Sequence, residues 1–432
     1  MDTKLRKIPF SPPDMTESEA QEVRDAILSG WITTGPRTKE LERKIAQFVH
    51  TEKAVCLNSA TASMEMVLHL LDLGPEDEVI VPAYTYTATA SVTQHLGCRL
   101  VMVDSQKDCV EMDYEQLEKA ITEKTKVIVP VDLGGIVADY DRVFEIVEAK
   151  RHLFSPGNAL QERFGRIVVS ADCAHSFGAM RKGRMAGEIA DFSSFSFHAV
   201  KNFTTAEGGA LTWNLPFGNE SVPVETDYLP QVPKKEGETW NELLYRLTQL
   251  FSLHGQNKDA LAKTQFGSWE YDIIGPWYKC NMTDIMAAMG LAQFERYPVL
   301  LHRRRDIVTK YNSEIDRLNE ELDADHLVKY LNHQDSEHCS SHHLYMTRLQ
   351  GRTREETNRV IGQMAERGIA TNVHYKPLPM MTAYKALGFD MKDYPNAYRL
   401  FENEITLPLH TCLTDEDIAY LITNFIDIVK CL

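Results

Sequence analysis

Asp172 and Lys201 each follow an apolar run, and their side chains have complementary chemistry. Asp172 ends the run IVVSAD, and Lys201 closes the Ser- and Phe-rich run DFSSFSFHAVK. Ends of strands are where α/β proteins place ligands. Pyridoxal phosphate needs this pair, because a lysine amine forms an imine with its aldehyde and an aspartate keeps its pyridine nitrogen protonated. Taken alone, such a pair is more often a plain ion pair or structural.

Further residues fit the other parts of the same cofactor. The segment NSATA at 58–62 begins a predicted helix, whose free N–H groups and positive end attract a dianion. Ser196 adds a hydroxyl from the run that leads to the lysine. Tyr86, in VPAYTYTATA, follows a predicted strand and can stack on a flat ring. Each residue alone has a plainer interpretation as a helix cap or core side chain.

Short β-branched runs separated by predicted helices would position these residues. The predicted strands are Glu78 to Pro82, Arg99 to Asp104, Lys126 to Asp132 and Arg166 to Asp172. Continuous apolar runs of this length are typical of strands buried on both faces of a parallel sheet. Helices at Tyr114 to Ile121 and Tyr140 to Ala149 lie between them. The alternation predicts an α/β domain around a mostly parallel sheet.

The remaining pattern predicts two domains. Residues 1–300 would form the large domain and residues 301–432 a smaller C-terminal α+β domain. The other predicted helices are Glu17 to Leu28, Thr38 to Phe48, Asp284 to Phe294, Arg303 to Leu318, Arg354 to Arg367 and Asp415 to Val429, with a strand at His343 to Leu349. A Pro-, Glu- and Lys-rich insertion near 215–265 carries one amphipathic helix from Leu243 to Phe251.

Composition narrows the class of protein. The 432 residues include 46 basic and 62 acidic ones, a net charge of −16, which argues against nucleic acid or an anionic membrane as a partner. No secretory signal and no apolar run long enough to span a bilayer is found. Eight scattered cysteines without a CxxC pair favour a reducing cytoplasm. The cluster His333, His338, Cys339, His342 and His343 matches no tetrahedral metal pattern, so no metal is expected.

The motif SFHAVKNFTTAEGG at 196–209 resembles the lysine motif of the DegT/StrS-type nucleotide-sugar aminotransferases. The resemblance spans nearly the whole chain. Its other motifs are GWITTGP at 30–36, NSATASM at 58–64, VPAYTYTATA at 81–90, ADCAHSFGA at 171–179, YKCNMTDIMAAMGLAQ at 278–293, HHLYMTRL at 342–349, VHYKPL at 373–378 and LPLHTCLT at 407–414. It implies the fold-type-I architecture of pyridoxal phosphate transferases, the aspartate-aminotransferase fold.

The resemblance implies a role for each site residue. Lys201 would hold the cofactor covalently and later move the proton, Asp172 would face the pyridine nitrogen, and His175 would lie near the ring oxygen. Ser196, Thr61 and Ala62 would bind the phosphate, and Tyr86 would stack on the ring. Asn281 or Lys279 would cross a homodimer interface to the neighbour's phosphate, so the active sites would be shared between subunits.

The reaction that the resemblance implies is transamination of a keto sugar linked to a nucleoside diphosphate, for the synthesis of amino sugars and polysaccharides. Glutamate would donate the amino group. A lysine at position 201 favours transamination over the dehydration performed by relatives with histidine there. Two alternatives stay open: an aminotransferase for a keto-cyclitol or other small keto substrate, and a regulatory protein that binds the cofactor without turnover.

Four features depart from the family pattern or have more than one interpretation. Ala206 replaces the usual glycine of the lysine-motif turn, which predicts a backbone without positive φ there. Arg303, Arg304 and Arg305 are interpreted as a solvated helix face rather than a substrate contact. Lys376 is a candidate for a pyrophosphate contact. For the loop with Trp31, Thr33 and Thr34 two interpretations stay open: it borders the substrate, or it does not.

Overall fold

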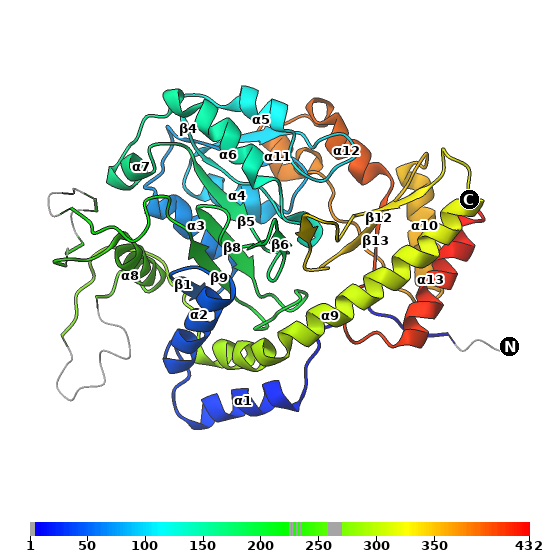
Figure 1. Ribbon diagram of the computed structural model, residues 1–432, viewed down its shortest axis with the longest axis horizontal. Coiled ribbons are helices and arrows are strands. Elements are labelled where there is room, and N and C mark those ends of the chain that lie inside the picture. The colour runs from blue at the N-terminus through cyan, green and yellow to red at the C-terminus, as the bar shows by residue number, and fades with distance from the viewer. Residues whose placement is uncertain (1–4, 224–225, 227, 230–231, 234, 258–269) are drawn as a thin grey trace.

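A computed structural model describes residues 5–223, 226, 228–229, 232–233, 235–257 and 270–432. Its largest element is a seven-stranded sheet of order β1-β9-β8-β5-β4-β2-β3 (Figure 1). Strands β8, β5, β4, β2 and β3 are parallel, and β9 pairs antiparallel with β8 and β1. The bounds are β1 Ala54–Leu57, β2 Glu78–Pro82, β3 Arg99–Val103, β4 Thr125–Ile128, β5 Val168–Asp172, β8 Phe192–Ser196 and β9 Gly209–Trp213. The mostly parallel sheet of the sequence analysis is confirmed.

One predicted strand is shorter than expected. The run Lys126 to Asp132 forms a strand only to Ile128. The residue after Val129 is Pro130, which has no backbone N–H to donate to a neighbouring strand. The chain nevertheless stays beside β5, since Val131 makes an isolated bridge to Asp172.

Alternate residues of the strands build separate cores on the two faces of the sheet. On β2, Val79 and Val81 belong to one cluster and Ile80 to the other, as the two-residue period of a strand requires. The first face is covered by α3 Ala60–Leu70, α4 Thr87–His95 and α8 Trp240–Ser252, and the second by α2 Pro36–Phe48, α5 Tyr114–Ala120 and α6 Tyr140–Ala149. The predicted helix of the insertion is confirmed as α8, although parts of the range 215–265 lie outside the described residues.

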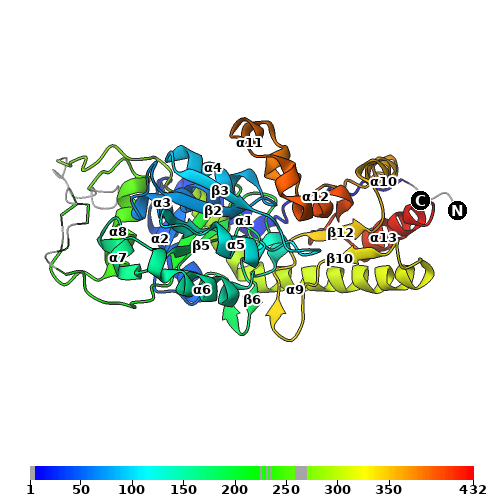
Figure 2. The same cartoon turned by 90° about the horizontal axis from the view of Figure 1, so that it is seen from above.

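A second, smaller unit lies at the other end of the molecule (Figure 2). It contains the three-stranded sheet β10-β12-β13 with α10 and α13, and it has its own hydrophobic cluster. The bounds are β10 Val328–Tyr330, β12 Tyr345–Leu349, β13 Glu404–Leu407, α10 Arg354–Glu366 and α13 Asp415–Val429. The remaining elements are α1 Glu17–Leu28, α7 Ala159–Phe164, α11 Thr382–Ala386, α12 Pro395–Glu402 and the short sheet of β11 His338–Cys339, β6 Met180–Arg181 and β7 Arg184–Met185.

A single helix, α9, runs from Asp284 to Glu321 and passes the predicted domain boundary at residue 300. The sequence analysis predicted two helices here, and that prediction is wrong. The helix contains Pro298, which lacks the N–H of an i to i−4 bond, but Pro298 is exposed while Tyr297 and Leu300 on either side are buried. Packing on both sides of the proline therefore keeps the helix continuous. The division into domains at 1–300 and 301–432 stays a prediction.

No helix within the described ranges combines the length and the apolar character that crossing a membrane requires.

Asp284, the first residue of α9, ties this helix to the start of α2. Its buried carboxylate accepts hydrogen bonds from the backbone N–H groups of Gly35 (2.8 Å), Arg37 (3.1 Å) and Thr38 (2.9 Å). The Thr38 hydroxyl donates a fourth bond at 2.7 Å. The first N–H groups of a helix have no partner within it, so one side chain satisfies the beginning of α2 from a distant part of the sequence.

We predict that Asp284→Ala lowers the free energy of unfolding by about 3 kcal/mol, because it leaves several buried donors without an acceptor. Glu320→Ala, an exposed acidic residue near the end of the same helix, is the matched control and should change stability by less than about 0.5 kcal/mol. Urea unfolding followed by circular dichroism measures both. Equal stability of the two variants would contradict the tie.

Candidate active site

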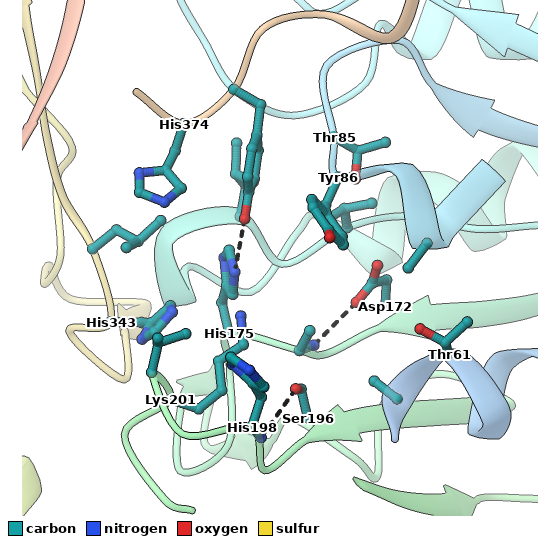
Figure 3. Close-up of a pocket in the computed structure, with 18 of the residues that line it drawn as sticks. Thr61, Thr85, Tyr86, Asp172, His175, Ser196, His198, Lys201, His343 and His374 are labelled. Carbon is teal, nitrogen blue, oxygen red and sulfur yellow. Dashed lines mark hydrogen bonds between the residues drawn. The ribbon is translucent and has the colours of Figure 1, made fainter. Parts of the chain in front are cut away.

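A pocket of about 490 Å³ opens at the carboxyl ends of β5 and β8 (Figure 3). Six predicted site residues line it together: Lys201, Asp172, His175, Ser196, Thr61 and Tyr86. They come from segments that are far apart in the sequence, and the parallel sheet gathers them at one edge. Ala62 and Asn281 do not line this pocket in the described chain, and their predicted roles stay predictions.

Asp172 is the last residue of β5 and is almost fully buried. Its Oδ2 accepts a hydrogen bond from the Thr89 hydroxyl at 2.7 Å, and its Oδ1 accepts one from the Ala174 N–H at 3.1 Å. Burial raises the pKa of the carboxyl, whereas these hydrogen bonds and the charge of Lys201 act in the opposite direction. Because burial excludes solvent from this carboxyl, a cation in the pocket would stabilise its charged form.

Lys201 lies in the turn after β8, where its backbone N–H donates to the His198 carbonyl at 2.9 Å. The residue is half-buried as a whole, and its side chain extends into the pocket. Burial lowers the pKa of its amine to about 8, and the Asp172 charge only partly opposes this. At neutral pH roughly a tenth of the amine is then uncharged, against less than about a thousandth for an ordinary lysine. The pocket therefore increases the fraction of the Lys201 amine that is uncharged and nucleophilic.

The beginning of α3 forms a cradle for an anion at one end of the pocket. Ser59 caps this helix, and its Oγ accepts a hydrogen bond from the N–H of Ala62 at 3.1 Å. The first turn of the helix, at Ala60 and Thr61, lines the pocket. Gly209 at the start of β9 packs against this turn, since an added Cβ would lie 2.4 Å from the Ser59 carbonyl carbon and 2.5 Å from the Ala60 nitrogen. The free N–H groups and positive helix end suit a phosphate.

Aromatic rings form the opposite side of the pocket. Tyr86, at the start of α4, exposes 58% of its surface in this chain and lies 5.8 Å from Tyr375 between ring centroids. Tyr375 lies between α10 and β13 in the sequence, so a segment far from the strands of the large sheet also contributes to the pocket. An exposed tyrosine ring beside a cavity is available for stacking against a flat ligand.

Three of the histidines that line the pocket, His175, His343 and His374, are held neutral. Burial lowers the pKa of His175 and of His343 well below its usual range, and it lowers the pKa of His374 to about 3. The Nδ1 of His175 accepts a hydrogen bond from the Gly134 N–H at 3.2 Å, so its ring proton lies on Nε2, which faces the Tyr375 hydroxyl at 3.3 Å. These imidazoles offer hydrogen bonds without adding charge.

Lys201 is the only lysine or arginine among the pocket-lining residues that the structure describes. Lys376, the candidate pyrophosphate contact, is exposed and lies outside the lining. The Asn281 side chain donates to Thr34 Oγ1 and also contacts Lys279 Nζ. The loop at Trp31, Thr33 and Thr34 likewise lies outside the lining.

Several residues that build the pocket were not predicted. Thr89, on α4, donates a hydrogen bond to Asp172. The sequence signal that could have identified Thr89 was its position three residues after Tyr86. His374 and Tyr375 line the pocket, although the sequence drew attention only to Lys376 beside them. His343, interpreted as the start of a core strand, precedes β12 and also lines the pocket, where its Nδ1 donates to Asn202 Oδ1 at 2.8 Å.

The arginine cluster on α9 was interpreted wrongly at its central member. Arg304 is 4% exposed, and its Nη1 donates to the backbone carbonyls of His342, His343 and Leu409 at 3.0–3.3 Å. Burial lowers the pKa of its guanidinium to about 10. It supports the segment that carries His343 and is not part of a solvated face. Within the described residues no group of histidines, cysteines and carboxylates is arranged to hold a metal ion.

The turn after Lys201 contradicts the expectation for Ala206, which has φ +67°. Hydrogen bonds on both sides account for this conformation: the Ala206 N–H donates to Thr204 Oγ1 at 3.0 Å, and the Thr205 hydroxyl donates to the Glu207 carbonyl at 2.7 Å. The turn keeps the left-handed geometry that usually selects glycine, at a cost of about 1 kcal/mol for an alanine.

Comparisons with known proteins agree with this geometry. The sequence profile described as the DegT/DnrJ/EryC1/StrS aminotransferase family matches residues 13–426. The chain is 32% identical over 429 residues to the spore coat polysaccharide biosynthesis protein SpsC of Bacillus subtilis, with 98% of this chain and 97% of SpsC covered.

Solved structures give the same result. The putative sugar aminotransferase Spr1654 from Streptococcus pneumoniae in its PMP-form is 55% identical, with a TM-score of 0.88 over 98% of this chain and 100% of that one. Its PLP-form gives 53% and 0.88, with 99% of both chains covered. The aminotransferase PseC from Helicobacter pylori, at 24% identity and a TM-score of 0.80 over 99% of this chain and 100% of that one, shares the fold. The fold is therefore that of the fold-type-I aminotransferases.

We predict that Ala206→Gly raises the free energy of unfolding by up to about 1 kcal/mol, because glycine adopts positive φ without a steric cost. Ala210→Gly provides the opposing control, since Ala210 is fully buried in strand β9 and should lose about 1 kcal/mol. Thermal unfolding of both variants tests the sign. A less stable Ala206→Gly protein would show that the turn is not strained at this residue.

Proposed function

The chain belongs to the DegT/DnrJ/EryC1/StrS aminotransferase family, and on that premise we propose that its Lys201 pocket transfers an amino group from glutamate to a keto sugar carried on a nucleoside diphosphate. The chain is a sugar aminotransferase whose cofactor is pyridoxal 5′-phosphate. The observation that carries the proposal is the placement of a buried amine and a buried carboxyl at neighbouring strand ends beside a helix start.

The residues of the pocket fit this cofactor. Asp172 would keep the pyridine nitrogen protonated, and a positive ring would in turn stabilise its buried carboxylate. Thr61 and Ser196, with the free N–H groups at the start of α3, suit the phosphate, and Tyr86 offers a face for the ring. Gly209 closely approaches Ser59 and Ala60, and this supports the assignment, because the approach brings the start of β9 against the start of α3.

Each step of the reaction then has a residue in place. When bound, pyridoxal phosphate supplies an aldehyde that captures amines and a ring that accepts electrons from the substrate carbon. Lys201 would hold the aldehyde through Nζ and yield it to the amino donor, and its freed Nζ would then carry the proton from the substrate carbon to the cofactor carbon that had borne the aldehyde. The Asp172 carboxylate would stabilise the positive charge of the ring nitrogen. We place the neutral Nε2–H of His175 beside the ring oxygen.

The substrate charges support a site shared between two subunits. Glutamate and a nucleoside diphosphate are anionic, whereas Lys201 is the only lysine or arginine that lines the pocket among the described residues. We propose that the chain forms a homodimer in which Asn281 or Lys279 reaches the phosphate in the neighbour's pocket. Lys279 is exposed and does not line the pocket of its own chain, which favours this arrangement.

The biological setting is proposed on the same basis. Similarity to SpsC supports a place in polysaccharide biosynthesis, where amino sugars are components. A cytoplasmic location accords with the eight free cysteines of the chain.

We predict that Lys201→Ala abolishes transamination, because no other amine among the described lining residues can bind the aldehyde or move the proton. Lys182→Ala removes an exposed lysine paired with Asp141 and is the matched control with normal activity. Amino transfer to a nucleotide-linked keto sugar is measured for both. A Lys201→Ala enzyme that turns over at the normal rate would overturn the assignment.

Asp172→Asn is expected to retain the fold and lose about thousandfold in rate, which corresponds to about 4 kcal/mol on the barrier. The neutral amide can accept from the Ala174 N–H through its oxygen and donate to the Thr89 hydroxyl through its NH2 group, but it no longer stabilises the protonated ring nitrogen. Circular dichroism checks the fold and single-turnover kinetics the rate. A rate within threefold of the original would remove the electron-sink role of this residue.

The amino donor is tested by the visible absorbance of the purified protein. Addition of glutamate should convert the bound cofactor from its aldehyde to its amine form, with loss of the long-wavelength band. Subsequent addition of a nucleotide-linked keto sugar should restore the band, and a keto-cyclitol should not. A spectrum that glutamate leaves unchanged would contradict the donor assignment.

A further inference from the structure

The backbone of His374, a wall residue of the pocket, is held from both sides by buried groups that do not touch the pocket. The Tyr84 hydroxyl donates to the His374 carbonyl at 2.6 Å. The His374 N–H donates to Glu404 Oε2 at 2.9 Å. Tyr84 and Glu404 are each 1% exposed, and neither lines the pocket. The position of His374 is thus set by residues behind the active site.

A second connection joins the same carboxyl to the imidazole ring. Thr406, fully buried on β13, lies between them: its hydroxyl is 2.9 Å from His374 Nδ1 and also hydrogen-bonds Glu404 Oε1. A hydroxyl has one proton, so Thr406 can donate to only one of these two partners and must accept from the other. The other ring nitrogen of His374, Nε2, has no hydrogen-bond partner among the described residues, and the ring lines the pocket (Figure 3).

The surroundings of Glu404 favour its neutral acid form at neutral pH. Burial raises its pKa to about 8, although the hydrogen bonds from the Thr406 hydroxyl and the His374 N–H, and then the positive charge of Arg354 on α10, act in the opposite direction. Arg348 on β12, Tyr84 after β2 and Tyr375 are the other ionisable groups near it. The cavity behind Glu404 is also lined by Asp108, Lys329 and Tyr330. His374 itself stays neutral, since its pKa is about 3.

Two arrangements of protons satisfy this chain of contacts. With Glu404 neutral, the carboxylic acid donates to Thr406, Thr406 donates to His374 Nδ1, and the ring proton lies on Nε2. With Glu404 ionised, Thr406 donates to the carboxylate, and Nδ1 must carry the ring proton in order to donate to Thr406. The conversion releases one proton from Nε2 into the pocket, while the Thr406 proton moves to Nδ1 and the Glu404 proton moves to Thr406.

We propose that Glu404 is a positioning residue that selects the tautomer of His374 through Thr406. His374 then presents an N–H donor to the pocket while Glu404 is neutral and a bare lone pair once Glu404 is ionised. On the proposed function, on which this last step rests, the donor faces the oxygens of the sugar substrate. An oxygen acceptor on the sugar would be bound by the first tautomer and repelled by the second.

The tautomer can be measured directly in the holoenzyme without substrate. Side-chain ¹⁵N chemical shifts of histidine-labelled protein distinguish a protonated ring nitrogen from a bare one, and the spectrum of His374→Asn assigns the signals. We expect the proton on Nε2 at pH 6.5 and on Nδ1 at pH 9.5, with a midpoint near pH 8. One tautomer at both pH values in the unaltered enzyme would overturn the proposal.

Substitutions separate the relay formed by Glu404, Thr406 and His374 from general effects of pH on the protein. In Glu404→Gln the amide oxygen still accepts from the His374 N–H and the amide N–H donates to Thr406, so Nε2 should stay protonated at both pH values. Thr406→Val should abolish the switch. Thr347→Val is the matched control, because Thr347 is a buried threonine on the adjacent strand β12 whose hydroxyl donates to the Ile405 carbonyl at 2.7 Å. A switch that persists in Glu404→Gln would also overturn the proposal.

Kinetic measurements connect the tautomer of His374 to the reaction. They also distinguish a failure of the tautomer proposal from a failure of the proposed function. The KM for the keto sugar should rise about tenfold between pH 7 and pH 9 in the unaltered enzyme and less than twofold in Glu404→Gln. Equal pH dependence in both enzymes would reject the substrate-binding role. If the spectra show the switch but no sugar is aminated, the relay is established and the proposed function alone has failed.

Discussion

A buried amine and a buried carboxyl share one pocket, and the rest of the structure depends on keeping them there. Burial drives both groups toward their neutral forms, since it lowers the pKa of Lys201 and raises the pKa of Asp172, while their mutual attraction acts the other way. A larger fraction of the amine is thereby uncharged near neutral pH, and a positively charged group in the pocket would stabilise the ionised carboxyl. The parallel pairing of β5 with β8 brings these two groups to one edge of the sheet.

The neutral walls of the pocket preserve this balance. A charged imidazole next to Lys201 would lower the amine's pKa further and would compete for Asp172. The structure instead surrounds the amine with His175, His343 and His374, all of which stay uncharged because they are buried. Histidine is useful there for its two distinct ring nitrogens, whose donor and acceptor functions the neighbouring residues decide.

Much of the fold could be predicted from local sequence, because strands such as Glu78–Pro82 and helices such as Asp415–Val429 carry their own periodicity and boundary signals. Lys201, Asp172 and Ser196 could be predicted to converge for the same reason, since each follows a recognisable strand. His374 and Thr89 could not, because their importance comes from contacts with residues distant in the chain. Arg304 and the continuous α9 were misinterpreted for a related reason: packing partners, absent from any local window, bury the first and override Pro298 in the second.

Helix α9 contributes Ala287 and Tyr297 to a hydrophobic cluster of the large sheet, and Ile307, Val308 and Tyr311 to the cluster of the small unit. Because helix formation is cooperative along the chain, loss of packing of α9 in one core weakens its helical structure in the other core as well. The two halves of the molecule, although each has its own core, should therefore melt together in a single transition instead of as independent folding units.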